Sequence, residues 1–298
     1  NAYLQIPELR GFEKFAQGRR AEDMPQITSR ICGVCPVAHH FASTKALDSA
    51  FDVEPTPVAK KLRELMNCGY FIYDHTLHFY FLGGPDFVVG PDAPPGKRNI
   101  LGVIEKAGLD IGKDVIKQRI TAILGGKATH PVNGLPGGVS KGLNAGEVKE
   151  IKEMASSCLE FAKFSLELFD DIVLKNKDYV DLITSDPYQL KTYNMGLVDE
   201  NNKVNFYDGD IRVKGQDDKE FLRFRVDDYQ EHLAERVEKW SYMKFPYLKK
   251  IGYNGYTDGP DSGFYRVGPL GRVNAADGMA TPLAQKEYDR FYETLGGR

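Results

Sequence analysis

The chain has 298 residues, of which 42% are apolar, enough for a sizeable core in one large domain or about two smaller ones. Its formal net charge is −3 at pH 7, a balance that gives no indication of a nucleic-acid partner or an anionic membrane surface. No apolar run reaches the roughly 18 residues of a membrane-spanning helix, and four cysteines are too few for a disulfide framework, so we expect a reduced, cytoplasmic setting without a membrane span.

The most informative segment reads Arg30-Ile-Cys-Gly-Val-Cys-Pro-Val-Ala-His39. Cys32 and Cys35 stand three positions apart in it. Pro36 suits the first turn of a helix, and helical spacing of small and apolar residues follows over 36–50. Cys35 is therefore expected at a helix N-terminus, where the helix dipole favours a thiolate. Two thiols in one tight turn indicate metal or redox chemistry rather than packing.

Further helices are predicted from apolar spacing and end signals. The second begins at Thr56-Pro57, with Thr56 as its N-cap, and ends at about Leu82. A loop rich in Gly and Pro is expected from Gly83 to Gly96, and another from His130 to Val139. The remaining predicted helices cover 99–124, 144–174 and 282–295.

A small β-rich insertion is predicted at 187–226, where turn signals separate short runs of β-forming residues. Residues 241–281 are predicted to be extended loop, because Gly, Pro, Tyr and Asp dominate there. The predicted strands of the insertion cover 203–207, 211–213 and 221–224.

The cysteine turn alone leaves the bound species open. Paired thiolates select soft or borderline metals, namely zinc, nickel, copper(I) and iron. A structural zinc site needs four ligands, and the chain offers no second Cys-x-x-Cys, although His75 and His78 could share a helix face. A thioredoxin-like redox pair is a weaker alternative, because the βαβ surroundings of that motif are missing.

The pattern Arg-x-Cys-Gly-x-Cys-x-x-x-His resembles the first metal-ligand motif of nickel–iron hydrogenase large subunits. Other blocks resemble the same family in the same order, and together they cover most of the chain. Two further stretches, 1–15 and 198–207, look most like the cytoplasmic, methyl-viologen-reducing type that works with heterodisulfide reductase. The additional family-like blocks are Arg10–Glu13, Asp74–Tyr80, His130–Val139 and Arg266–Leu283.

The resemblance implies a mainly α fold, in which residues 1–298 form one partial hydrogenase large-subunit domain. That domain would be a bundle of long helices with a small antiparallel β appendage. It also implies the catalytic subunit of a nickel–iron hydrogenase, which cleaves H2 reversibly and heterolytically to protons and electrons. The electrons would pass to iron–sulfur clusters of a small partner subunit, because four cysteines cannot house a cluster chain. Further electron-transfer subunits such as heterodisulfide reductase would follow.

Individual residues take roles from this resemblance. Cys32 would be a terminal nickel ligand, and Cys35 a ligand that bridges nickel and an iron carrying CO and cyanide. His39 would donate a hydrogen bond toward the bridging sulfur, and such contacts tune ligand basicity. Asp74 would lie near the open side of the metal pair, with a structural ion pair as its alternative. Glu13 would bind magnesium, with a surface salt bridge as its alternative.

Departures from the family pattern set limits on these expectations. The family's second cysteine pair, expected as Asp-Pro-Cys-x-x-Cys, does not occur in the 298 residues. We therefore expect this chain to be part of a longer polypeptide, truncated at both ends, that supplies two of four thiolates and is inactive alone. The alternatives are a non-catalytic scaffold subunit similar to the quinone-site subunit of respiratory complex I, and a structural zinc protein.

Overall fold

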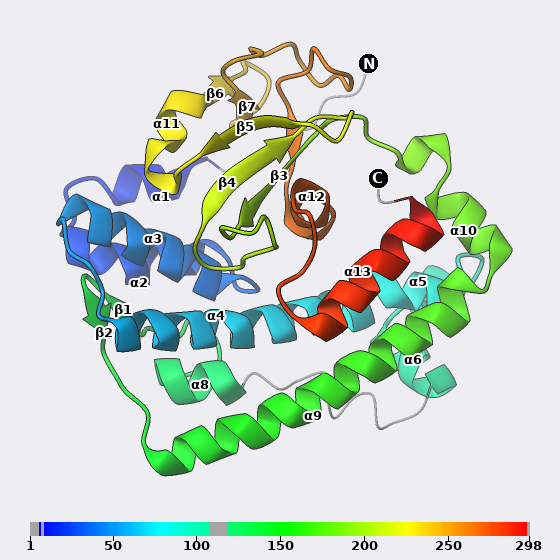
Figure 1. Cartoon of the computed structure of the whole chain (residues 1–298), viewed down its shortest axis with the longest axis horizontal. Coiled ribbons are helices and arrows are strands. Elements are labelled where there is room, and N and C mark those ends of the chain that lie inside the picture. The colour runs from blue at the N-terminus through cyan, green and yellow to red at the C-terminus, as the bar shows by residue number, and fades with distance from the viewer. Residues whose placement is uncertain (1–5, 7–8, 108–118, 297–298) are drawn as a thin grey trace. The chain divides into compact units, whose positions relative to one another are not determined.

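The computed structural model describes residues 6, 9–107 and 119–296. The chain forms two compact units, one of residues 12–183 and the other of the remaining described residues. The first is almost entirely helical, and the second combines short strands with helices (Figure 1). The chain is thus mainly helical with a small sheet, as predicted. Among the described helices, none combines the length and the apolar content that crossing a bilayer requires.

The helical unit begins with short elements that lead into the cysteine turn. These are α1 (Gly11–Phe15) and α2 (Met24–Thr28), followed by a 3₁₀ turn, Ser29–Ile31. Helix α3 (Pro36–Ala50) then starts where the sequence predicts, with Cys35 as its N-cap residue. Because Pro36 occupies the first helical position, its missing N–H costs no intrahelical bond.

Helix α4 (Pro57–Leu77) also starts as predicted, because the Thr56 side chain accepts a hydrogen bond from Ala59 N–H at 3.3 Å. The loop predicted from Gly83 is wrong at its start. The chain instead forms a π-helix, His78–Gly83, and then α5 (Gly84–Val88). Gly84 N–H donates to the oxygen of Phe79, five residues earlier, and a Cβ on Gly84 would collide with that oxygen. Glycine here permits a wide helical turn and does not end the helix.

The third predicted helix is only partly seen. Helices α6 (Ile100–Ala107) and α8 (Arg119–Gly125) occupy its two ends, and residues 108–118 lie outside the described part of the chain. The loop predicted after it is confirmed as non-helical, and it forms a small antiparallel hairpin of β1 (Gly134–Leu135) and β2 (Gly138–Val139).

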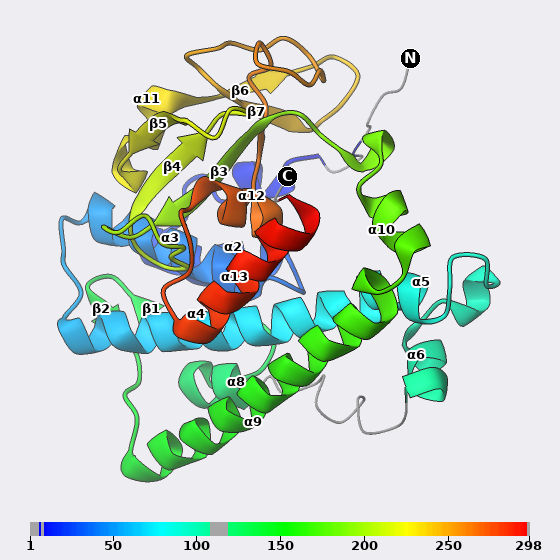
Figure 2. The ribbon, with the colours of Figure 1, turned by 45° about the vertical axis from the view of Figure 1, so that its right-hand side comes forward.

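The long helix predicted at 144–174 is confirmed as α9 (Ala145–Phe169), which continues into a π-helix, Asp170–Leu174. Asn144 caps it, and Glu147 completes a capping box. Helix α10 (Lys177–Ile183) ends the unit. In both views, α2 and α3 lie on one side of α4, and α8 and α9 on the other (Figures 1 and 2).

The second unit contains a four-stranded sheet in the order β5-β4-β3-β8, in which only the β3–β8 pair is parallel. Its core includes Met195, Val213 and Leu248. Gly196 lets helix α12 approach β3, since a Cβ there would lie 2.9 Å from the Arg272 Cα. The strands are β3 (Tyr193–Val198), β4 (Asp210–Lys214), β5 (Glu220–Phe224), β6 (Leu233–Val237), β7 (Lys244–Leu248) and β8 (Tyr265–Arg266), and the helices are α11 (Tyr229–His232), α12 (Gly268–Ala275) and α13 (Pro282–Leu295).

Two predictions for this unit are wrong. Residues 203–207 form only an isolated bridge, between Val204 and Val198, and the strand that pairs with β4 is β3 instead. Asn194 and Gly196, which are residues of low strand propensity, lie inside β3 and hid its strand character. Residues 241–281 are not all loop, because β7, β8 and α12 lie within them. The β structure therefore extends beyond the predicted insertion at 187–226. The last helix, α13, has the predicted bounds.

Candidate metal centre

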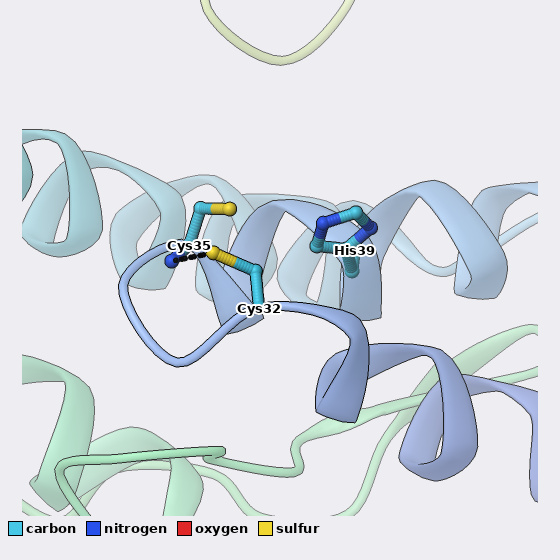
Figure 3. A group of neighbouring side chains, drawn as sticks. All are labelled: Cys32, Cys35 and His39. Carbon is cyan, nitrogen blue, oxygen red and sulfur yellow. Dashed lines mark hydrogen bonds between the residues drawn. The ribbon is translucent and has the colours of Figure 1, made fainter. Parts of the chain in front are cut away.

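The cysteine turn joins a 3₁₀ turn to the first turn of α3 and holds both thiols on one side. Cys32 has an extended backbone, and Cys35 is the N-cap of α3. The backbone N–H of Cys35 donates to the Cys32 sulfur at 3.1 Å, which closes the turn (Figure 3). His39 follows one helical turn after Cys35, so its side chain lies on the same face of α3.

Three metal-binding groups converge here. The sulfurs of Cys32 and Cys35 and a ring nitrogen of His39 all lie within 4.8 Å of one another, and all three residues are half-buried. Figure 3 shows the two thiols beside each other, with the imidazole on the next turn. Within the part of the chain that the structure describes, no other group of three potential ligands is this close.

The pKa values of the two thiols are shifted in opposite directions. Burial acts to raise the pKa of Cys32, but hydrogen bonds from the Cys35 thiol and from the N–H groups of Cys35 and Val34 outweigh it and lower that pKa. Burial, the hydrogen bond donated to Cys32, and the charges of Cys32 and Asp74 raise the pKa of Cys35 to about 12. Of the two thiols, Cys32 is thus the one that loses its proton more readily, and not Cys35 as expected, because the Cys35 thiol donates its proton in a hydrogen bond to Cys32. Burial also lowers the pKa of His39.

Contacts from neighbouring elements fix the position of the turn. The hydroxyl of Tyr73 on α4 donates to the Val34 carbonyl, in the middle of the turn, at 3.0 Å. The Thr28 hydroxyl lies 2.8 Å from the Met24 oxygen and 3.3 Å from the His39 oxygen, at the α2–α3 junction. The sequence does not predict these contacts, because an isolated Tyr or Thr gives no signal of such a role.

A buried ion pair links the far end of α3 to α4 and the hairpin. The Arg63 guanidinium, 1% exposed, lies 2.5 Å from the Asp48 carboxylate and also donates to the carbonyls of Leu135 and Gly138. The Asp48 carboxylate accepts a hydrogen bond from Gly137 N–H at 2.7 Å. The predicted 130–139 loop is therefore joined to α3, the helix that begins at the cysteine turn.

Asp74 and Glu13 fall outside the three-residue group. Asp74 lies on α4. Burial is the main cause that raises the pKa values of Cys35, Tyr70 and Tyr73, and the nearby Asp74 charge adds to the rise. The Asp74 side chain is 25% exposed and lies 3.7 Å from the His75 ring. Glu13 lies on the exposed side of α1. Their predicted roles stay predictions.

The donor set suits a soft or borderline metal ion. Two sulfurs and one imidazole nitrogen favour nickel, zinc, iron or copper(I) and are a poor match for magnesium or calcium. A metal ion binding here would displace the thiol protons, so both cysteines could ligate it despite their different pKa values. Any remaining coordination position would be filled by groups outside this cluster.

Comparison with known proteins places these residues in a family context. Residues 10–93, which include the whole cysteine turn, match the family model described as nickel-dependent hydrogenase. The chain is 46% identical, over 98% of its length, to one subunit of the vhu F420-non-reducing hydrogenase of Methanocaldococcus jannaschii. It is 45% identical, over its full length, to the iron-sulfur subunit of an F420-non-reducing hydrogenase of Archaeoglobus profundus.

Among solved structures, the chain is similar to an NAD+-reducing [NiFe]-hydrogenase in the H2-reduced state. The TM-score is 0.86 at 33% sequence identity, and the match covers 97% of this chain and 63% of the other. The chain spans 62% of the Archaeoglobus relative and 68% of the Methanocaldococcus relative.

Proposed function

Because this chain belongs to the nickel-dependent hydrogenase family, we propose that it forms part of the catalytic subunit of a nickel–iron hydrogenase. The reaction is H2 ⇌ 2 H+ + 2 e−, run reversibly and heterolytically. One observation carries the proposal: the matched segment brings Cys32, Cys35 and His39 together as three soft-metal donors within 4.8 Å. We propose that residues 1–298 are one partial large-subunit domain built as a long-helix bundle.

The roles follow from the donors and their surroundings. In this proposal Cys32 and Cys35 would hold the nickel–iron centre through their sulfurs, Cys32 as the terminal nickel ligand and Cys35 as the ligand shared with an iron that would carry CO and cyanide. Thiolate sulfur is both electron-rich and basic, so these two residues hold the centre and give a departing proton a place to bind. When bound, the nickel–iron centre supplies the open coordination position at which H2 is polarised. His39 orients toward the sulfurs from the same face of α3 and adjusts their basicity.

Asp74 and Glu13 take supporting roles in the proposal. The negative charge of the Asp74 carboxylate raises the proton affinity of the thiols. Its contribution to the raised pKa of Cys35 supports this role. In this proposal Asp74 would lie near the open side of the metal pair. Glu13 supplies a hard oxygen ligand to a magnesium ion, which prefers such ligands to sulfur.

The electrons need a route away from the site, and four cysteines cannot hold a chain of iron–sulfur clusters. We propose that the partner is an iron–sulfur small subunit, in a cytoplasmic hetero-oligomer of the methyl-viologen-reducing type. Heterodisulfide reductase is a candidate for the next electron carrier. The chain gives no indication of a nucleic-acid partner.

Two alternatives remain distinguishable. A scaffold subunit of the complex I type would not need thiols, and the retention of Cys32 and Cys35 in one metal-sized cluster argues against it. A structural zinc protein would use the same sulfurs but would hold zinc and show no infrared bands from CO or cyanide.

The test uses the complete natural polypeptide, purified anaerobically with its co-purifying partners. We expect about one nickel per chain and hydrogen uptake. Cys32→Ser and Cys35→Ser should each abolish uptake and remove most of the nickel, since a hydroxyl is a poor ligand for nickel. Cys68→Ser, on the exposed part of α4, is the matched control and should change neither. Zinc in place of nickel, or full uptake in the Cys35→Ser variant, would reject the proposal.

A further inference from the structure

The imidazole of His40 is fully buried beside the cysteine turn and contacts three backbone groups. Its Nδ1 lies 3.1 Å from the Pro25 carbonyl oxygen. Its Nε2 accepts hydrogen bonds from Asn133 N–H at 3.2 Å and Gly134 N–H at 2.9 Å. Because backbone amides can only donate, Nε2 carries no proton, and Nδ1–H donates to Pro25.

The ring therefore joins three segments that are distant in sequence. Pro25 belongs to α2, His40 lies five residues after Cys35 on α3, and Asn133 and Gly134 enter the hairpin. The hairpin segment is itself fixed, since the Asn133 side chain donates to the Leu124 carbonyl of α8 at 2.6 Å.

The loop and α3 pack closely at this point. A Cβ on Gly134 would lie 2.7 Å from the Thr44 hydroxyl oxygen, and Thr44 is fully buried one turn after His40. A second histidine strengthens the same junction, because His130 Nδ1 lies 2.8 Å from the carbonyl oxygen of Ser29, three residues before Cys32.

We propose that His40 is a positioning residue of the metal centre, which holds the first turn of α3, and so Cys35 and His39, against the 133–134 backbone. The expected effect on nickel binding rests on the proposed function, whereas the expected effect on the 133–134 backbone does not. Loss of the ring would leave two buried N–H groups without an acceptor and open a cavity behind the turn. The turn would then be free to move relative to its metal.

Three substitutions of His40 distinguish the hydrogen bonds that Nε2 accepts from the one that Nδ1 donates. His40→Gln places an amide oxygen near the position of Nε2 and can still accept from Asn133 and Gly134. His40→Asn keeps a donor near Nδ1 for Pro25 but has no acceptor that reaches the loop. His40→Leu removes both functions. Thr44→Val is the matched control, since it deletes a buried hydroxyl of α3 that donates to the His40 carbonyl and leaves the ring contacts in place.

The first readout is amide hydrogen exchange at residues 133 and 134, which needs no metal. His40→Asn should exchange roughly tenfold faster there, the change that loss of one ordinary hydrogen bond produces. His40→Gln and Thr44→Val should exchange at nearly the original rate. Equal amide exchange rates at residues 133 and 134 in all variants would overturn the positioning role of His40, whether or not the chain binds nickel.

The second readout is the metal centre of the complete natural protein, measured by nickel retention against a chelator and by the infrared bands of the iron's diatomic ligands. Removal of outer contacts to metal ligands costs about 10–100-fold in metal affinity, and we expect the lower end, roughly tenfold, for His40→Asn and His40→Leu. His40→Gln should restore retention and band positions. Unchanged bands in His40→Asn, or equal losses in Thr44→Val, would overturn the inference. Absence of nickel from the unmodified protein would instead reject the proposed function.

Discussion

At the scale of single residues, the hydroxyl of Tyr73 is the contact that fixes the middle of the cysteine turn. It lies on α4, 5% exposed, and donates to the Val34 carbonyl. Tyr73→Phe should lower the free energy of unfolding by about 1 kcal/mol, since it removes one buried hydrogen bond and keeps the ring. It should also weaken nickel retention, because Val34 lies between the two cysteines. Urea unfolding and metal analysis after dialysis measure the two effects.

Tyr80→Phe is the control for this prediction. The Tyr80 hydroxyl, on a ring 2% exposed, pairs with Ser165 on α9 at 2.8 Å. Its loss should cost a similar amount of stability. Nickel retention should stay unchanged, because this contact does not touch the turn. Equal loss of nickel in both variants would mean that Tyr73 acts only through overall stability.

The sequence predicts some of these residues and not others. The spacing of Cys32, Cys35 and His39 is local, so one turn and the start of a helix are enough to bring them together. The contacts of Tyr73 and His40 depend on where α4 and the hairpin pack, and no local pattern contains that information. Which of the two thiols has the lower pKa could not be predicted either, because it depends on the hydrogen bond that the Cys35 thiol donates to Cys32 and not on the helix dipole alone.

At the scale of elements, the Asp48–Arg63 pair joins α3, α4 and the hairpin. Removing one partner of a buried pair costs about 3–5 kcal/mol, because the other charge is left buried without compensation. Asp48→Asn should therefore lower the free energy of unfolding by about 3 kcal/mol, since the Leu135 and Gly138 carbonyls still solvate Arg63. The urea midpoint followed by circular dichroism measures the loss.

Glu54→Gln provides the comparison for this ion pair. Glu54 pairs with Lys60 at 2.8 Å, but its side chain is 86% exposed. Exposed pairs contribute about 0–1 kcal/mol, so this variant should unfold nearly as the unmodified chain does. A loss in Asp48→Asn no larger than that in Glu54→Gln would show that the buried pair does not join these elements.

The elements with strong local signals were predicted well. Helix α4 begins at its Thr56 cap, and α9 begins at its Asn144 capping box. The errors fall where the signal is ambiguous: Gly83-Gly84-Pro85 is typical of a loop, yet in a π-turn the glycine is what allows the helix to continue. Strand β3 was missed because Asn194 and Gly196 weaken its local strand signal.

At the scale of the whole molecule, the chain has the mainly helical content that the sequence indicates, and its cysteine turn lies within one of two compact units. The family could be inferred from ordered motifs, because each motif is local and their order adds specificity. How the 133–134 backbone and α4 hold the site could not be inferred, since it depends on packing between segments that are 39 and 94 residues apart in the sequence.

The central claim is that Cys32 and Cys35 ligate nickel. The most direct test is X-ray absorption at the nickel edge on the complete natural protein, unmodified and as the Cys35→Ser variant. We predict a nickel shell dominated by sulfur in the unmodified protein and a smaller sulfur contribution in any nickel that the variant retains. A nickel shell without sulfur, or one that Cys35→Ser leaves unchanged, would contradict the claim.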